Sequence, residues 1–345
     1  MKKVLKAVVL MLSIVFMTVL TGCGKEKETA TTFKGKNVRV VIGSTSTSGD
    51  SYLIADTVSR HLGKALGANL KVDAVGAAEA LAAMQDSKPD GNTVMIFHDM
   101  TYLGVSFKSY DEMYKLENMT VGPRVAQNPG AAWAAGINAP YNDVTEIPKY
   151  LQENPEAVCR MACEAGGVSH IGFIAFYDWV VKNYGQEVAS RIVVVVGGST
   201  ADKCQLLWDG NCDVIFADYT SLKDYTETDD PKIGMKFVGL LDNIEGVDVK
   251  SYADLGITVN DGEFRFSKDF LMYMPKDFPA ELVAELDAAM AAVSADEQFN
   301  ADLGRMNYRS AYLNSADAKE FIYNKRNNTQ VLIDNSPSLD DLVQK

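Results

Sequence analysis

Three short segments rich in glycine and hydroxyl side chains carry the residue types best suited to chemistry in this sequence. They span residues 43–51, 165–170 and 196–200, and each lies between a predicted strand and a predicted helix. Backbone N–H groups at a helix start point outward, the helix dipole adds partial positive charge, and Ser or Thr hydroxyls add donors. The segments are therefore suited to binding an anion. The alternative for each is a solvated loop that only caps its helix.

We expect the ligand-binding residues to come from these segments and from two neighbouring positions. Tyr52 lies one residue into the first helix and could reach a ligand, and His98 with Asp99 follows a predicted strand end. Loops at the carboxyl ends of parallel strands are where open α/β sheets bind ligands. The candidate residues are Ser44, Thr45, Ser46, Thr47, Ser48, Gly49, Asp50, Tyr52, His98, Asp99, Gly166, Gly167, Ser169, His170, Gly198, Ser199 and Thr200.

Catalytic and metal sites have weaker support in the sequence. There is no Gly-x-Ser-x-Gly elbow, and the first segment lacks the Gly-Lys-Ser/Thr of a Walker loop. The chain has three histidines, and His61 is predicted to lie on a helix surface. The Cys-x3-Cys spacing at Cys159 and Cys163 differs from the usual zinc spacing. We predict a binding protein without cofactor or metal, with a secreted hydrolase as a remote alternative.

The state of four cysteines is left open by the sequence. Cys159, Cys163, Cys204 and Cys212 form an even number, which outside the cell suggests disulfides. An extended segment would hold Cys159 and Cys163 too far apart for one bond. A bond between Cys204 and Cys212, a bond from Cys163 to another loop, and free buried thiols all remain possible.

Alternating strand and helix patterns must position these loops. Residues 37–42, 70–75 and 93–97 are predicted strands, and residues 51–66 and 77–85 are predicted helices, which implies a parallel sheet. A similar series begins near residue 132, with strands over 132–137, 157–162, 192–196 and 213–217. Helices over 143–153, 169–183 and 199–208 lie between them. Strands over 236–241 and 270–274 follow, and then helices over 279–292, 296–306 and 315–334 that we expect to pack on the first half.

The first residues resemble a bacterial lipoprotein signal. Lys2, Lys3 and Lys6 precede an apolar run of about 14 residues, too short to span a bilayer. The run ends in Leu-Thr-Gly-Cys, which resembles a lipobox with Cys23 as the lipidated residue. We therefore predict a signal peptide over 1–22, and a lipidated cysteine with a flexible tether over 23–36. The protein is then expected on the outer face of the cytoplasmic membrane.

Composition excludes several function classes. The 345 residues are 47% apolar and carry a formal net charge of −13, which fits a folded protein and argues against nucleic-acid binding. No repeat of 20–50 residues is visible. We expect a monomer with two domains, one formed by residues 37–131 and 240–345 and the other by residues 132–239.

Several motifs resemble, in order, those of the substrate-binding proteins of tripartite tricarboxylate transporters, the TctC or Bug family. A Pro-Asp-Gly turn at 89–91, the Gly-rich loop at 165–170 and the stretch from 198 to 218 carry the likeness, with a further segment at 252–256. The resemblance implies a type II periplasmic-binding-protein fold of two α/β domains, each a mostly parallel sheet flanked by helices. It also implies a carboxylate bound between the domains, with Asp218 added to the candidate residues, and partners in a large and a small membrane subunit.

The chain departs from the family pattern in its loops. Tyr52 stands where an aspartate is usual and Asp50 comes two residues early, while Gly167 replaces a serine and Gly197 a lysine. The ligand therefore need not be citrate. A sensor or scaffold of the same fold, signalling to a membrane partner, is the alternative to a transport receptor.

Overall fold

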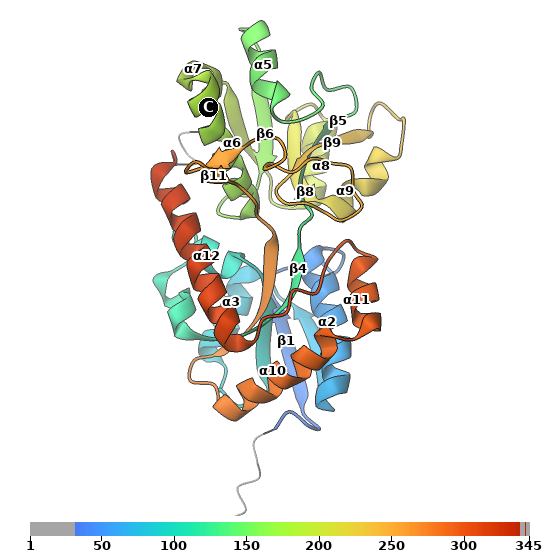
Figure 1. Cartoon of the computed structure of the whole chain (residues 1–345), viewed down its shortest axis with the longest axis vertical. Coiled ribbons are helices and arrows are strands. Elements are labelled where there is room, and N and C mark those ends of the chain that lie inside the picture. The colour runs from blue at the N-terminus through green and yellow to red at the C-terminus, as the bar shows by residue number, and fades with distance from the viewer. Residues whose placement is uncertain (1–31, 339–341, 343–345) are drawn as a thin grey trace, which may run out of the picture. The chain divides into compact units, whose positions relative to one another are not determined.

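The computed structural model describes residues 32–338 and 342, and it contains two five-stranded sheets (Figure 1). From Phe33 onward the chain forms one compact unit. The first sheet has the order β2-β1-β3-β12-β4 and the second has the order β7-β6-β8-β5-β9. The first consists of β1 (Asn37–Ile42), β2 (Asn69–Ala74), β3 (Thr93–Phe97), β4 (Met119–Asn128) and β12 (Lys268–Pro275). The second consists of β5 (Ala131–Gly136), β6 (Cys159–Cys163), β7 (Ile192–Val196), β8 (Val214–Asp218) and β9 (Met235–Leu240).

Helices connect the strands and cover the sheets. Short 3₁₀ turns lie at Glu112–Tyr114 and Leu116–Asn118, and a small hairpin pairs β10 (Thr258–Val259) with β11 (Gly262–Glu263). The helices up to the middle of the chain are α2 (Asp50–Leu66), α3 (Ala77–Asp86), α4 (Met100–Ser106), α5 (Glu146–Glu153), α6 (Val168–Tyr184) and α7 (Gln186–Ala189). The later ones are α8 (Thr200–Trp208), α9 (Tyr219–Thr226), α10 (Ala280–Ser294), α11 (Glu297–Gly304) and α12 (Ser315–Asn335). None of the helices in residues 32–338 is long and apolar enough to cross a bilayer.

Both sheets are mixed. In the first, β1 pairs in parallel with β2 and β3, whereas β12 is antiparallel to β3 and β4. In the second, β6 pairs in parallel with β7 and β8, whereas β5 is antiparallel to β8 and β9. The predicted fold of two α/β sheets flanked by helices is confirmed, but the sheets are mixed rather than mostly parallel. Half of their strand pairings are antiparallel, because β12 and β5 enter their sheets from the opposite direction.

This strand order brings the carboxyl edges of the two sheets together. Because β12 is antiparallel to its neighbours, its first residue, Lys268, lies beside the last residue of β4, Asn128. The first residue of β5, Ala131, lies beside Asp218 at the end of β8. Only Pro129 and Gly130 separate β4 from β5, and three Cα–Cα steps span about 11 Å at most. The two edges are therefore close to each other at this crossing.

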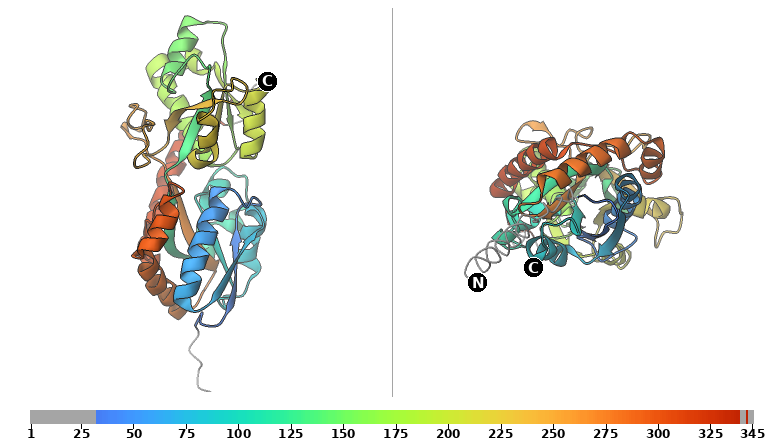
Figure 2. Two further views of the ribbon diagram at one scale, coloured as in Figure 1. Left: turned by 90° about the vertical axis from the view of Figure 1, so that its right-hand side faces the viewer. Right: turned by 90° about the horizontal axis from the view of Figure 1, so that it is seen from below.

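The C-terminal helices pack against elements of the first sheet and its helices. Helices α10 and α11 pack against α2, and α12 packs against β4 and α6 (Figures 1 and 2). One core joins the strand residue Val40 and the α2 residue Ile54 to Leu282 of α10 and Phe299 of α11, all fully buried. The helical tail thus packs on the first half of the chain, as the sequence predicts.

Two features correct the predictions from sequence. Strand β4 and helix α4 were not expected, and they supply the crossing between the sheets and one side of the loop cluster. The flexible tether was expected to reach residue 36, but Phe33 is 1% exposed and stacks on Phe278, with ring centroids 6.4 Å apart. The amide of Gly35 also donates to the carbonyl of Gly67. Residues 33–36 therefore belong to the folded unit, while Cys23 and the predicted signal peptide lie outside the described residues.

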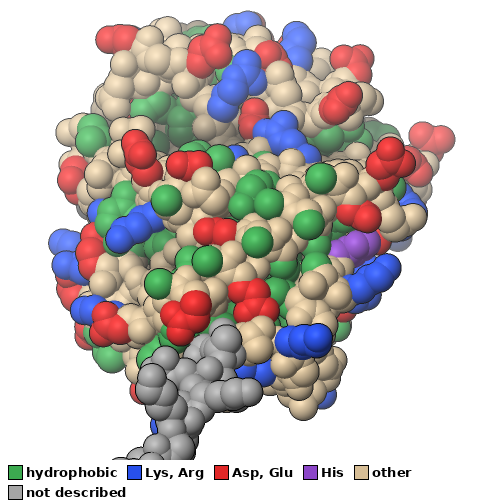
Figure 3. Space-filling model, turned by 60° about the horizontal axis from the view of Figure 1, so that its bottom comes forward, with side chains coloured by type: hydrophobic (Ala, Val, Ile, Leu, Met, Phe, Trp, Pro, Cys, Tyr) green, Lys and Arg blue, Asp and Glu red, His purple; other side chains and the backbone are tan. Residues whose placement is uncertain are grey.

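Charge on the surface is mixed. On the face drawn in Figure 3, acidic and basic side chains alternate with small groups of apolar ones. The net charge of −13 therefore forms no continuous acidic patch on this face.

Candidate functional site

Loops from both sheets meet at the facing carboxyl edges. The first sheet contributes residues 43–49 after β1 and His98 after β3, and the second contributes the loops after β6, β7 and β8. The aromatic ring of Phe107, which ends α4, stacks on His170 of α6 with centroids 4.2 Å apart. A Cβ placed on Gly166 would lie 2.7 Å from Oγ of Ser109. Through α4 and the residues that follow it, the chain after β3 is thus in direct contact with the loop after β6, and this is where the two loop sets meet.

An ion pair lies at the centre of this region. Nζ of Lys268 is 2.6 Å from Oδ2 of Asp50, and both side chains are 12% exposed. Burial by itself would raise the pKa of Asp50, but the positive charge of Lys268 and the bonds from Lys268 and Asn128 lower it to about 2. Asp50 is therefore ionised, and it neutralises Lys268.

Asn128 connects this pair to the second sheet. Its amide nitrogen donates to Oδ2 of Asp50 at 2.9 Å and to Oδ1 of Asp218 at 2.6 Å. Its oxygen accepts from the amide of Gly130 at 2.7 Å. The nitrogen and the oxygen of this fully buried side chain therefore both bond to residues at the crossing between the sheets. Burial and the negative charge of Asp50 raise the pKa of Asp218 to about 6, and the Tyr308 hydroxyl donates to its other oxygen at 3.3 Å.

The hydroxyl loop after β1 is largely bonded to itself. Ser44 Oγ accepts from the amide of Ser46, and Ser46 Oγ bonds to Ser48 Oγ at 3.1 Å. Thr45 and Thr47 are exposed, and Gly49 is the N-cap of α2. The loop therefore lies at the edge of the first sheet, and its hydroxyl groups bond to one another instead of pointing together at a ligand position. Tyr52 packs against the core of the first sheet rather than against the other loops.

His98 and Asp99 follow β3 but have different surroundings. Burial and the nearby charge of Lys268 lower the pKa of His98 to about 3, so its ring is neutral, and its Nδ1 accepts from the amide of Met100 at 3.4 Å. Asp99 is fully buried, and its two oxygens accept from Tyr102, from the amide of Asp269 and from Lys325.

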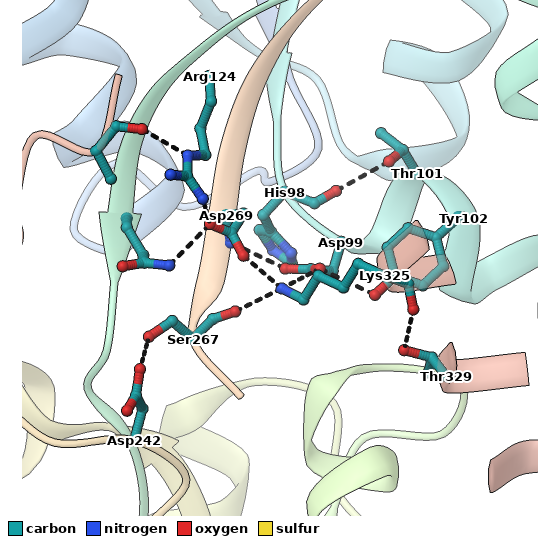
Figure 4. A network of polar contacts seen from close by, with 12 residues as sticks. His98, Asp99, Thr101, Tyr102, Arg124, Asp242, Ser267, Asp269, Lys325 and Thr329 are labelled. Atoms are coloured by element: carbon teal, nitrogen blue, oxygen red, sulfur yellow. Dashed lines mark hydrogen bonds and ion pairs between the residues drawn. The ribbon is translucent and has the colours of Figure 1, made fainter. Parts of the chain in front are cut away.

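Lys325 of α12 joins the crossing strands to the loop after β3. Figure 4 shows its ammonium between the carboxylates of Asp99 and Asp269, at 2.6 Å from each. Arg124 of β4 donates to the other oxygen of Asp269 at 2.8 Å. Both carboxylate oxygens of Asp99 therefore accept hydrogen bonds from residues of the fold. The structure gives Asp99, a predicted ligand-binding residue, a role in holding α12 rather than in contacting a ligand.

The loop after β6 is fixed by Ser169. Oγ of Ser169 accepts from the amide of Glu164 at 2.8 Å and donates to the carbonyl of the same residue at 3.2 Å. Ser169 is 3% exposed, so its hydroxyl serves this loop rather than a ligand. Gly166 has a φ of 73°, which favours glycine there, and Gly167 is the N-cap of α6.

His170 presents a buried donor. Its Nδ1 accepts from the amide of Gly166 at 3.3 Å, which assigns the ring proton to Nε2. Burial lowers the pKa of His170 to about 4, so the ring is neutral near pH 7. Its Nε2 is buried and has no hydrogen-bond partner among the described residues. A buried donor left unpaired costs about 1–3 kcal/mol, which a ligand could recover.

The loop after β7 opens helix α8. Ser199 caps this helix, accepting from the amide of Asp202 at 3.0 Å, while Asp202 accepts from the amide of Ser199. Gly198 and Ser199 are exposed and Thr200 begins the helix. One turn in, Lys203 is 4% exposed, and burial lowers its pKa.

Five charged or polar residues at this site were not predicted. Long-range tertiary contacts bring Lys268, Asn128 and Tyr308 to this place, and the local sequence does not reveal those contacts. Glu164 directly follows a predicted strand and Lys203 lies one turn into a predicted helix, so their positions did carry a signal. The four cysteines are buried and free, which settles the open alternatives. Among residues 32–338 and 342, no group of three or more His, Cys, Asp or Glu side chains is arranged to hold a metal.

Comparison with known proteins gives similarity in structure only. No protein-family model and no curated protein matches the sequence. A TctC solute-binding protein from Polaromonas, without ligand, aligns with a TM-score of 0.62 and 19% identity, over 88% of this chain and 99% of that one. The periplasmic binding protein BugD gives 0.68 and 16%, over 90% and 99%. MatC from Rhodopseudomonas palustris, with bound malate, gives 0.67 and 17%, over 86% and 99%. The chain therefore has the fold of the TctC and Bug solute-binding proteins.

Proposed function

We propose that this chain is an extracytoplasmic receptor that binds a small organic anion, a carboxylate above all, between the carboxyl edges of its two sheets. The observation that carries the proposal is the unpaired Nε2 donor of His170 at the place where the two loop sets meet. Support also comes from the fold, which is that of proteins such as the malate-bound MatC. The unpaired donor of His170 suits an anion, which supports a binding site.

The proposal includes movement of two domains. Residues 37–131 and 240–345 would form one domain and residues 132–239 the other; close to these bounds, the chain passes from one sheet to the other between β4 and β5 and again after β9. Two connections, 129–130 and 241–267, cross between the sheets. A ligand that bonds to loops of both sheets would stabilise the arrangement in which they meet. The closed protein would then deliver its ligand to the membrane subunits of a tripartite tricarboxylate-type transporter.

Ligand-dependent thermal unfolding tests this function. The chain from residue 24 onward would be melted with mono-, di- and tricarboxylates, amino acids and aromatic acids. A ligand at 100 times its Kd adds about 2.7 kcal/mol, which raises Tm by several degrees. One responding chemical class supports the receptor proposal. No response to any compound, with a protein shown to be free of retained ligand by mass spectrometry, would contradict it.

Membrane attachment has its own test. We propose that Cys23 carries a lipid that holds the protein on the outer face of the cytoplasmic membrane. The Cys23→Ser variant should leave the membrane fraction, whereas the unchanged chain should sediment with it and label with a radioactive fatty acid. An unchanged chain that stays soluble and unlabelled would contradict the lipid anchor and leave the binding proposal intact.

A further inference from the structure

Two side chains of opposite charge at neighbouring strand ends of the second sheet lack a bonded partner. Lys203 of α8 is 4% exposed, whereas Glu164, which directly follows β6, is exposed. Within residues 32–338 and 342, neither the ammonium of Lys203 nor the carboxylate of Glu164 makes a hydrogen bond or an ion pair within 4 Å. The buried ammonium without a partner is costly, and the exposed carboxylate beside it is accessible to a ligand. Both groups are therefore available for charges that come from a ligand.

Backbone geometry places the two side chains next to each other. The amide of Gly197 donates to the carbonyl of Cys163 at 3.0 Å, so the ends of β6 and β7 are adjacent. Glu164 continues from Cys163 and is fixed on both sides of its peptide by Ser169. The stem of Lys203 passes over Gly197, where a Cβ would lie 2.5 Å from Cγ of Lys203. Glycine at this position thus leaves room for the lysine.

The other charges nearby cancel each other. Lys203 interacts electrostatically with Glu164 and Lys268, and Glu164 interacts with Lys268 and Asp50. Asp50 and Lys268 already form their own ion pair at 2.6 Å. What remains at this place is one positive and one negative side chain. Burial lowers the pKa of Lys203, and a bound carboxylate would oppose that change.

We propose that Lys203 and Glu164 together recognise a zwitterionic ligand, which carries a carboxylate and an ammonium group as amino acids do. Lys203 binds the carboxylate and Glu164 binds the ammonium. A ligand with carboxylates alone would satisfy Lys203 but would add negative charge beside Glu164. This inference rests on the proposed receptor function and narrows its ligand class.

Matched pairs of ligands that differ by one amino group test the inference. L-aspartate is compared with succinate, and L-glutamate with glutarate, by titration calorimetry on the chain from residue 24 onward. The unchanged protein should bind one amino compound at least tenfold more tightly than its partner. Glu164→Gln should remove that preference while retaining carboxylate binding, and Lys203→Met should weaken both compounds of the pair at least tenfold.

Two exposed residues of α5 provide matched controls. Lys149→Met and Glu153→Gln remove the same charges from exposed positions on another helix and should leave both affinities unchanged. Circular dichroism and Tm of each variant show whether it is folded. Equal affinity for amino and des-amino compounds, or a preference that survives Glu164→Gln, would overturn the inference while the receptor function stands. If none of the four compounds binds but another carboxylate of the panel does, the inference is overturned and the receptor function stands. If no compound of the panel binds, both the inference and the receptor function are overturned.

Discussion

Asp50 and Lys268 are 218 positions apart in the sequence and form an ion pair of 2.6 Å at the edge of the first sheet. The pair exists because β12 runs antiparallel to β3 and so begins at the edge where α2 also begins. Asn128 then bridges Asp50 to Asp218 of the second sheet. The same three side chains therefore fix the loop after β1 and join the two sheets.

Removing the lysine of this pair should destabilise the protein. Lys268→Met leaves the Asp50 carboxylate without its counter-charge in a mostly buried place, at an expected cost of about 3–5 kcal/mol in the free energy of unfolding. The double variant Asp50→Asn with Lys268→Met removes both charges and should recover most of that loss. Urea unfolding measures both.

The exposed pair of Arg39 and Asp73 provides the control for this cycle. These side chains are 48% and 46% exposed, so Arg39→Met should cost at most about 1 kcal/mol. Equal losses from Arg39→Met and Lys268→Met would show that the central pair contributes no more than a surface one.

Asp218 should make stability depend on pH in an unusual direction. Its pKa is about 6 in the folded chain, against an ordinary value of 3.8, so the folded state holds this proton more tightly. The stabilisation is fully present below pH 4 and is lost as the pH rises through 6, by about 1–3 kcal/mol. The contribution of Asp50 to stability has the opposite sign. Its pKa is lowered in the folded chain, so its stabilisation is lost only as the pH falls from 4 toward 2.

The variant Asp218→Asn isolates this contribution. Urea unfolding at pH 4.5 and pH 7 should show that the stability of the variant relative to the unchanged protein is higher at pH 7 by about 1–3 kcal/mol, because only the unchanged protein ionises a buried carboxyl at that position. This comparison removes the contributions of His98 and His170, whose lowered pKa values act in the opposite sense. Asp73→Asn, at an exposed position, should show no such gain at pH 7. A variant and a parent with the same pH dependence would rule out Asp218 as its source.

Local patterns predicted most of the elements because those patterns depend on near neighbours. The run Asn37–Ile42 is β-branched and became β1, and the helical spacing of α2 ends at Gly67, whose φ is 61°. Strand β4 was missed because Gly122 and Pro123 interrupt its pattern. It is an edge strand held by β12, and an edge position tolerates proline.

The site was predicted less well than the fold. The sequence predicted loops that do lie at the facing sheet edges, but hydroxyls such as Ser169 and Ser199 bond within their own loops. Whether a serine hydroxyl points at its own backbone or at a ligand depends on loop conformation, which residue type does not determine. The buried charges Lys203 and Lys268 matter through neighbours brought together by tertiary pairing, and no local pattern encodes those neighbours.

Gly43 should not tolerate a larger residue. A Cβ at this position would lie 1.9 Å from the ring of Phe97, which is buried in β3. Gly43→Ala should therefore lower the free energy of unfolding by about 1–3 kcal/mol, and adding Phe97→Leu should restore part of the loss. Gly304→Ala is the control, since a Cβ there meets nothing within 4 Å. Equal Tm values for the two single variants would show that the contact relaxes without cost.

His170 should affect ligand binding more than stability. His170→Phe keeps an aromatic ring against Phe107 but removes the Nε2 donor, which is unpaired in the described structure. We expect the Tm of the variant to change little, because removal of the unpaired donor offsets loss of the bond that the Gly166 amide donates to Nδ1. If the donor bonds to a ligand carboxylate, the affinity for the responding ligand should fall about tenfold, which corresponds to about 1.4 kcal/mol.

The matched control for His170 is His61, which lies on α2 and bonds through Nε2 to Asp302 at 2.9 Å. His61→Phe loses that bond, so its Tm should fall while its ligand affinity stays constant. The two histidines thus make opposite predictions for the same substitution: one changes affinity without stability, and the other changes stability without affinity. An unchanged affinity in His170→Phe would mean that the ligand does not contact Nε2, and the donor would then have to be satisfied by water at the facing edges.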